Sequence, residues 1–289
     1  MNSNNLYLRP VDMTAEKISP FAVFHGEEIY AYANPTAGYP MCLTDVDQLI
    51  LLLTNKCLLM TTSLLEAALA KEMMITQKEI QNRVRQLQRS HYLEKFEFRC
   101  ESGKSAGKVY SLGYRGAGFL RAARVKVNLT QYVSTLNAVQ TKKILATVQY
   151  VIRSGADLEQ TSICRPCFVP PVLENEKTSD IFRPQAWIQS ADGSIFVEAV
   201  RRNDDAEDEL LDKLWRMEKV LTSASTNIPV TSPSLLLICE DERHMHTIME
   251  CVKTYAVCSF AIRYTYDTAV YTDSSRLYTA SDALRKNFA

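Results

Sequence analysis

Apolar and polar positions follow a helical period in three segments between residues 44 and 90. Each segment opens with a hydroxyl residue followed three positions later by an acid. This is the capping box, which satisfies amides that lack partners at a helix start. The three pairs are Thr44 with Asp47, Ser63 with Glu66, and Thr76 with Glu79. The pattern predicts three short helices that begin at these positions.

Two extended runs follow the third helical segment. YLEKFEFRC (92–100) and KVYSLGY (108–114) are rich in β-forming residues, and ESGKSAG (101–107) between them is rich in Gly and Ser. This composition predicts a hairpin. Three helices followed by a hairpin is the order of a winged helix, a form of helix-turn-helix. Residues 44–126 are therefore predicted to form a winged-helix domain.

The rest of the chain divides into three parts. Residues 1–43 carry four prolines and no sustained period, which predicts an N-terminal arm with one short strand in AVFHGEEIYAYA (22–33). Residues 127–158 are helical in pattern, and their apolar face could serve a core, a dimer or a connector. We interpret them as a helical connector. Residues 159–289 alternate strand-like and helical runs, which is typical of an α/β domain. The predicted fold class is therefore multidomain α+β.

The third helical segment has two distinct faces. Ile80, Val84 and Leu87 recur at i, i+4 and i+7 and are predicted to face the core. The opposite face carries Arg, Asn and Gln, which can make paired hydrogen bonds to base edges in the major groove, together with a lysine. Its residues are Gln77, Lys78, Gln81, Asn82, Arg85 and Arg89.

Basic residues concentrate around this helix. From Thr76 to Lys126 there are twelve Lys and Arg against four Asp and Glu, in a chain whose formal net charge is zero. Lys104 and Lys108 fall at the predicted hairpin tip, where a wing would meet phosphates. Three arginines extend the basic segment: Arg115, Arg121 and Arg124. Such a surplus is an electrostatic footprint of double-stranded DNA binding. The alternative is a protein-interaction adaptor with a solvated helix face.

The C-terminal region contains a second predicted hairpin, with SADG as the turn between QAWIQ (185–189) and SIFVEAV (194–200). Alternation places Ile195, Val197 and Ala199 on one face of the second strand, and Phe196, Glu198 and Val200 on the other. An acid inside an apolar strand needs an ionic partner or a metal. Lys213 and Arg201 are the candidate partners.

This hairpin resembles the metal-binding hairpin of restriction-endonuclease-like nucleases. Those enzymes keep one acid before the turn, and a second acid and a lysine two residues apart on the next strand. The carboxylates hold Mg²⁺, and the lysine orients or activates water. Together with the predicted winged helix and LLDKLWRMEKVL (210–221), the segment RPQAWIQSADGSIFVEAVRR (183–202) is similar to the replication-relaxation family, over about residues 44–240.

The resemblance implies a DNA-binding protein of a mobile genetic element, acting in plasmid replication, relaxation or transfer, or in transcriptional control. In such a protein the nuclease-like domain could serve formation of a homodimer, DNA backbone contact, or docking of a relaxase or replication protein. Pro184 and Ala186 fit the family's first strand, but Gln185 replaces its acid. Glu198 fits the second strand, and Lys213 fits the following helix.

Val200 stands where the nucleases keep their lysine, so we assign no catalytic residue and expect the nuclease-like domain to be inactive. The alternative is a Mg²⁺-dependent nuclease with a rearranged site made of Glu198, Asp180 and Lys213. Mg²⁺ is expected as a cofactor only in that case.

Cysteine usage and hydropathy predict a cytoplasmic location. The polar start of the chain does not resemble a signal peptide, and its most apolar run, LILLLTNKCLLM (49–60), is too short and too polar to cross a bilayer. We therefore expect the eight cysteines to be free thiols and the protein to have no membrane partner. Cys164 and Cys167 have the spacing of zinc ligands but lack a second such pair, so no metal site is predicted.

Overall fold

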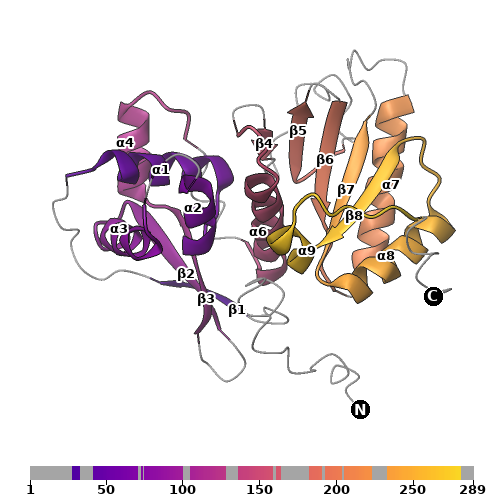
Figure 1. Ribbon diagram of the computed structural model, residues 1–289, viewed down its shortest axis with the longest axis horizontal. Coiled ribbons are helices and arrows are strands. Elements are labelled where there is room, and N and C mark those ends of the chain that lie inside the picture. Colours follow the sequence, from indigo (N-terminus) through magenta and orange to yellow (C-terminus); the bar gives the residue numbers. More distant parts are fainter. Residues whose placement is uncertain are drawn as a thin grey trace.

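The computed structural model describes residues 28–32, 42–70, 73, 75–99, 105–127, 136–158, 161–163, 182–190, 193–203, 205–222 and 233–280. These residues form a mixed α and β structure with two sheets, one in each unit of the chain (Figure 1). We call β1–β3 with α1–α4 the N-terminal unit, and β4–β8 with α6–α9 the C-terminal unit.

Three helices open the N-terminal unit: α1 (Asp45–Cys57), α2 (Thr62–Leu69) and α3 (Gln77–Arg89). The predicted capping boxes of α1 and α3 are confirmed. In each, the hydroxyl of the cap accepts from the third backbone amide, and the acid accepts from the amide of the cap. These reciprocal bonds explain why both helices begin where the sequence predicts.

The predicted start of α2 at Ser63 is wrong. Thr61 is the cap, with its side chain accepting from the Leu64 amide at 3.2 Å. Thr61 has the extended backbone that a cap requires, whereas Ser63 already lies in the first helical turn. The Ser63 hydroxyl bonds instead to the Thr61 hydroxyl at 2.9 Å.

A three-stranded antiparallel sheet completes this unit. The predicted hairpin is confirmed as β2 (Leu93–Arg99) and β3 (Ser105–Leu112). The short strand predicted in the N-terminal segment is β1 (Glu28–Tyr32), which pairs with the other edge of β2. After the hairpin the chain turns at Gly113 into α4 (Tyr114–Ala122), which contacts α1 and β2.

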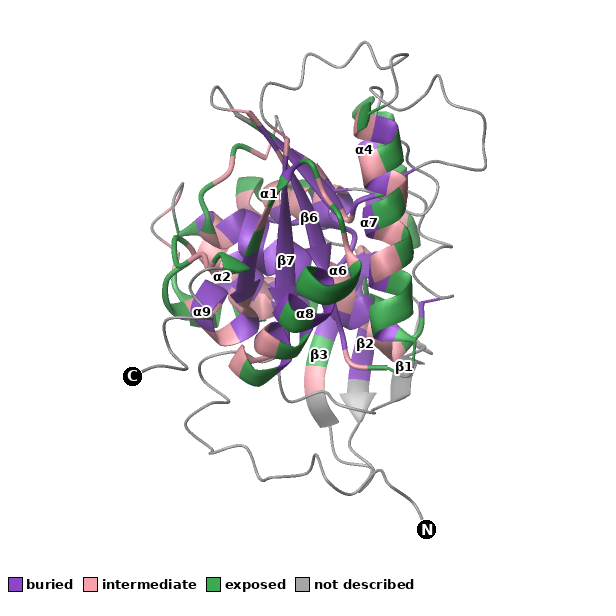
Figure 2. Cartoon of the chain, turned by 90° about the vertical axis from the view of Figure 1, so that its right-hand side faces the viewer, coloured by how far each residue is buried: buried purple, intermediate pink, exposed green. Residues whose placement is uncertain are grey.

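The C-terminal unit has three layers. Its five strands lie in the order β4 (Thr161–Ile163), β5 (Ala186–Ser190), β6 (Gly193–Ala199), β7 (Ser234–Cys239) and β8 (Ala261–Tyr266). β4, β5 and β6 are antiparallel neighbours, whereas β6, β7 and β8 run parallel. Helices cover both faces, which explains why β7 is buried along its whole length (Figure 2).

The helices of this unit divide between the two faces of the sheet. α7 (Ala206–Thr222) and α8 (Glu242–Tyr255) pack on one face, and α6 (Ala138–Arg153) and α9 (Asp267–Thr272) pack on the other. The predicted alternation along β6 is confirmed, because Phe196 and Val200 join the core under α7 and α8 while Val197 and Ala199 join the core under α6.

α6 is both a core helix and a connection between the units. It contacts β6 and α9 on one side and α2 on the other, and in Figure 1 it stands on the side of the C-terminal unit that faces the N-terminal unit. One continuous hydrophobic cluster accordingly runs from Leu65 of α2 through Leu145 of α6 to Val197 of β6. Asn137 caps this helix by accepting from the Gln140 amide at 2.8 Å. Residues 128–135 of the predicted connector lie outside the described residues.

Among the described helices, none combines the length and the apolar character needed to cross a lipid bilayer.

Candidate nucleic-acid interface and the Glu198 pocket

The two faces predicted for α3 are observed. Ile80, Val84 and Leu87 are buried in the core. All six residues predicted on the opposite face are exposed: Gln77, Lys78, Gln81, Asn82, Arg85 and Arg89. The exposed face is therefore entirely polar and carries three positive charges from this set.

An ion pair between helices fixes the position of α3. Arg83 donates from Nε to Oδ1 of Asp47 at 2.8 Å, and its Nη2 pairs with Oδ2 of the same carboxylate. Asp47 is fully buried and also caps α1 through the Thr44 amide. Sequence reasoning assigned Asp47 to the capping box alone, because nothing in a local pattern links two residues 36 positions apart. The bidentate pair anchors α3 to α1 while leaving the outer face of α3 exposed.

The hairpin packs beside α3, which contacts β2. Burial raises the pKa of Tyr110 on β3, and the positive charge of Arg85 opposes that rise. Lys108 is exposed and lies two residues from Tyr110, hence on the same face of β3. The prediction that Lys108 lies at the hairpin tip is wrong, because Lys108 pairs in register with Glu97 inside the strand. Lys104 lies outside the described residues.

The other predicted basic residues lie on a different surface. Arg115, Arg121 and Arg124 belong to α4 and the turn that follows it. Arg121 and Arg124 are exposed, whereas Arg115 is half-buried and donates to the Ser90 carbonyl at 3.3 Å. In Figure 1, α4 stands at the top of the N-terminal unit, and α3 and the hairpin lie below it. The basic segment 76–126 is therefore divided between two surfaces.

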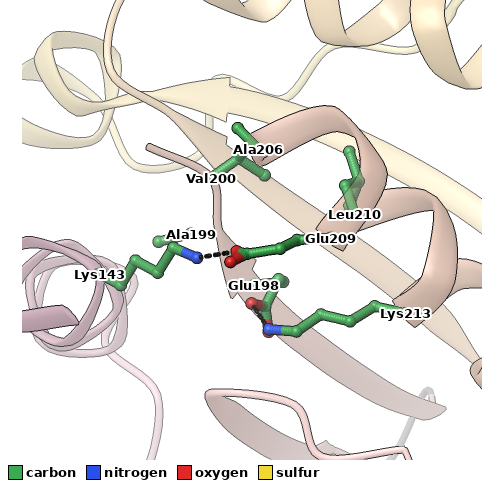
Figure 3. Close-up of a pocket in the computed structure, with 8 residues that line it drawn as sticks. All are labelled: Lys143, Glu198, Ala199, Val200, Ala206, Glu209, Leu210 and Lys213. Atoms are coloured by element: carbon green, nitrogen blue, oxygen red, sulfur yellow. Dashed lines mark hydrogen bonds and ion pairs between the residues drawn. The ribbon is translucent and has the colours of Figure 1, made fainter. Parts of the chain in front are cut away.

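The Glu198 pocket lies between α6, β6 and α7. The carboxylate of Glu198 is almost completely buried, and its Oε1 pairs with Nζ of Lys213 (Figure 3). A second ion pair, Lys143 Nζ to Glu209 Oε2 at 3.0 Å, stands beside it. The pocket is lined by Lys143, Glu198, Ala199, Val200, Ala206, Glu209, Leu210 and Lys213. Of the two candidate partners for Glu198, Lys213 is thus the correct one.

Gln185 completes the surroundings of Glu198. The Ala199 amide donates to Oε1 of Gln185 at 2.9 Å, and the Thr147 hydroxyl lies 2.8 Å from the same oxygen. Because a backbone amide can only donate, the atom of Gln185 that faces Glu198 must be the amide nitrogen. It donates to Oε1 of Glu198 at 3.0 Å. Gln185, which stands where an acid is expected, is therefore held by a donated and an accepted bond, a combination that an ionised carboxylate cannot make.

One further position of the nuclease comparison can be placed. Val200 is buried in the core under α7 and α8, and its amide donates to the Ile238 carbonyl at 2.9 Å. Asp180 lies outside the described residues, as do Cys164 and Cys167.

Oε2 of Glu198 is buried and has no hydrogen-bond partner among the described residues. In that part of the chain, no three acidic, His or Cys side chains gather as a metal site would require.

Arg201, the other candidate partner of Glu198, pairs instead with Asp267 at 2.8 Å. Both side chains are buried, and burial raises the pKa of Asp267 to about 6 while the Arg201 charge opposes the rise. Arg202 forms a second cluster with Glu240 and Asp241. These residues follow the ends of β6, β7 and β8, which are parallel and so meet at one edge of the sheet. That shared position is the signal from which sequence reasoning could have found the cluster.

The described cysteines are free thiols, as predicted: Cys42, Cys57, Cys239, Cys251 and Cys258. Burial raises the pKa of Cys57 to about 12 and also raises that of Cys239. These two thiols are consequently unreactive core residues.

Comparison of the chain with family models, with curated proteins and with solved structures found no match.

Proposed function

We propose that the N-terminal unit is a winged-helix domain that binds double-stranded DNA. In this proposal α3 enters the major groove, and the β2–β3 hairpin lies along the adjacent backbone. The observation that carries it is the outer face of α3, where six polar or basic side chains stand exposed above a fully apolar inner face. Asp47 and Arg83 hold the helix in place without using that face.

The chemistry of the face fits base recognition. Arg can bond to guanine through two donors, and Asn and Gln can bond to adenine through one donor and one acceptor. Lys108 is exposed on β3, in the hairpin whose strand β2 contacts α3, and its ammonium group can contact a phosphate. In this proposal the helix supplies the groups that recognise bases, and the hairpin supplies a positive charge for the backbone.

We propose in addition that the C-terminal unit is a restriction-endonuclease-like domain that does not cleave DNA. Its antiparallel β5–β6 hairpin carries Glu198 on the second strand, where the nuclease hairpin keeps an acid. Gln185 supplies an amide where an acid is expected, and Val200 is an apolar core residue where a lysine is expected. Lys213 neutralises the remaining carboxylate. The domain then serves dimerisation, backbone contact or docking of a replication protein.

The biological role follows from the resemblance to the replication-relaxation family. We propose a part in replication, relaxation or transfer of a plasmid or integrative element, or in control of those genes. A cytoplasmic location agrees with that role, since the DNA of such elements is cytoplasmic in bacteria.

Titration of a fluorescent DNA duplex at several salt concentrations tests DNA binding. Arg85→Ala is expected to weaken binding roughly tenfold. Lys108→Ala is expected to reduce the slope of log affinity against log salt by about 1, as loss of a phosphate contact does. The control is Arg243→Ala, which removes an exposed arginine from α8 in the other unit. Failure to retain DNA at low salt would favour the adaptor, as would equal affinities for all three variants.

Incubation with supercoiled and single-stranded DNA in Mg²⁺ or Mn²⁺ tests the second proposal. We expect the DNA to remain intact. Cleavage that disappears in Glu198→Gln would show instead that a nuclease site operates around Glu198.

A further inference from the structure

The outer face of α4 is a second exposed surface with its own chemistry. Tyr114, Gly118 and Arg121 follow one another at i, i+4 and i+7, so they lie in one row along the helix. All three are exposed, and 63% of Tyr114 is accessible to solvent. The row spans about 10 Å at the helical rise per residue. It places an aromatic ring at one end and a guanidinium group at the other.

Planar side chains gather at the Tyr114 end of the row. The His91 ring lies 5.4 Å from the Tyr114 ring at an interplanar angle of 36°. The Arg115 guanidinium lies 5.1 Å from the centre of the Tyr92 ring and donates to the Ser90 carbonyl. Three types of group that stack on nucleobases, namely imidazole, phenol and guanidinium groups, therefore lie where the turn before β2 meets the start of α4.

Backbone contacts make this cluster rigid. The Gly113 amide donates to the Tyr92 carbonyl at 2.8 Å, and the Arg115 amide donates to the His91 carbonyl at 3.2 Å. A side chain at Gly113 would meet the His91 carbonyl oxygen at 2.4 Å, and one at Gly116 would meet that of Tyr92 at 2.3 Å. The absence of side chains at Gly113 and Gly116 lets α4 pack directly against the turn that contains His91 and Tyr92.

Gly118 has no such reason to be glycine. A Cβ atom added there would meet no other atom within 4 Å. Glycine inside a helix costs about 1 kcal/mol relative to alanine, and packing does not require it at this position. Because Gly118 has no side chain, the helix backbone is accessible between Tyr114 and Arg121, and the backbone of a ligand could approach it closely.

The surrounding charge favours a polyanion. Between Gly113 and Val127 the sequence has four Lys and Arg and no Asp or Glu. Arg121, Arg124 and Lys126 are all exposed. An exposed aromatic ring beside such charge suits a strand whose bases are unpaired, because bases inside a duplex cannot stack on a protein ring.

We propose that the outer face of α4 binds single-stranded DNA. One base stacks on Tyr114 beside His91, the sugar–phosphate backbone passes over Gly118, and a phosphate meets Arg121. This contact is independent of the duplex binding proposed for α3. A protein with both surfaces would hold a junction between paired and unpaired DNA.

The test uses the full chain and a short oligothymidine strand that carries one 2-aminopurine base. Stacking of that base on an aromatic ring changes its fluorescence. We expect Tyr114→Ala to lower affinity for the strand roughly tenfold and to abolish the fluorescence change. Tyr114→Phe is expected to preserve both. Gly118→Leu is expected to weaken single-strand binding while leaving the unfolding temperature equal or higher, because leucine favours the helix.

The controls separate this surface from α3. Arg85→Ala should weaken binding of a duplex and leave the single strand unaffected, and Tyr114→Ala should do the reverse. If the wild-type chain binds duplex but no single strand at low salt, the inference about α4 fails while the proposal for α3 stands. Unchanged single-strand affinity in Tyr114→Ala would also overturn it, as would tighter binding by Gly118→Leu.

Discussion

Oε1 of Glu198 accepts a hydrogen bond from Nε2 of Gln185 at 3.0 Å, and the same oxygen pairs with the Lys213 ammonium group. The other atom of the Gln185 amide accepts from the Ala199 backbone. Two donors therefore meet one oxygen of this buried carboxylate, whereas its Oε2 has no hydrogen-bond partner among the described residues. The Gln185 amide donates to Glu198 and accepts from Ala199, so each of its two atoms has a matching neighbour. Replacing it by the acid that a nuclease would keep removes a donor and adds a charge.

We expect Gln185→Glu to destabilise the fold. Its second oxygen would face Glu198 at hydrogen-bond distance, so two carboxylates would repel each other where solvent screens little. The free energy of unfolding should fall by about 2–3 kcal/mol at neutral pH, as measured by urea denaturation. The control is Gln189→Glu, the same change at an exposed position of β5, which should cost less than about 0.5 kcal/mol. Equal costs for both variants would contradict this account of Gln185.

We expect Arg83 and Arg85, two residues apart on α3, to behave differently. Arg83→Met leaves the buried Asp47 carboxylate without its partner, so the free energy of unfolding should fall by about 2 kcal/mol; the side chain is a quarter exposed, which reduces the cost. Arg85→Met should change stability by less than about 0.5 kcal/mol, since Arg85 is exposed. Thermal and urea denaturation of both variants check this, and a larger loss for Arg85 would contradict it.

His244 should make stability depend on pH. Burial lowers its pKa to about 4, although the Glu240 carboxylate opposes that shift. The Glu240 amide also lies 3.3 Å from Nδ1 of His244, a contact that requires an unprotonated nitrogen. Between about pH 6.5 and pH 4 the unfolded chain therefore binds a proton that the folded chain does not. Stability is present above this window and is lost as the pH falls, by up to about 3 kcal/mol.

His244→Asn isolates this contribution, because the asparagine oxygen can replace Nδ1 as an acceptor but does not titrate. Its unfolding free energy should fall less than that of the wild type between pH 7 and pH 5, by about 2 kcal/mol. Asp267 acts in the opposite direction in the same range, since its raised pKa makes the folded state bind the extra proton, so the difference between the two proteins is the informative quantity. His246→Asn, the same substitution two residues further along α8, is the control.

Patterns among neighbouring residues predicted helix caps and strand faces. They could not predict which side chains far apart in the sequence form ion pairs. The caps at Thr44 and Thr76 and the faces of β6 depend on residues two to four positions apart, so the sequence shows them directly. The partner of Glu198 could be narrowed to two side chains, but choosing Lys213 over Arg201 required knowing that Asp267 lies beside Arg201. The basic segment looked continuous because a linear count cannot show that the chain turns at Gly113 and carries its last arginines to another surface.

The shared core around α6 has a consequence for how the chain could have been assembled. Leu65 and Val197 belong to one hydrophobic cluster, with Leu145 of α6 between them. Recombination could replace one unit by a unit of another protein only if the incoming unit packed against the surface of α6. If α3 binds DNA as proposed, new DNA targets would arise more readily by substitutions on the exposed face of α3 than by exchange of a whole unit.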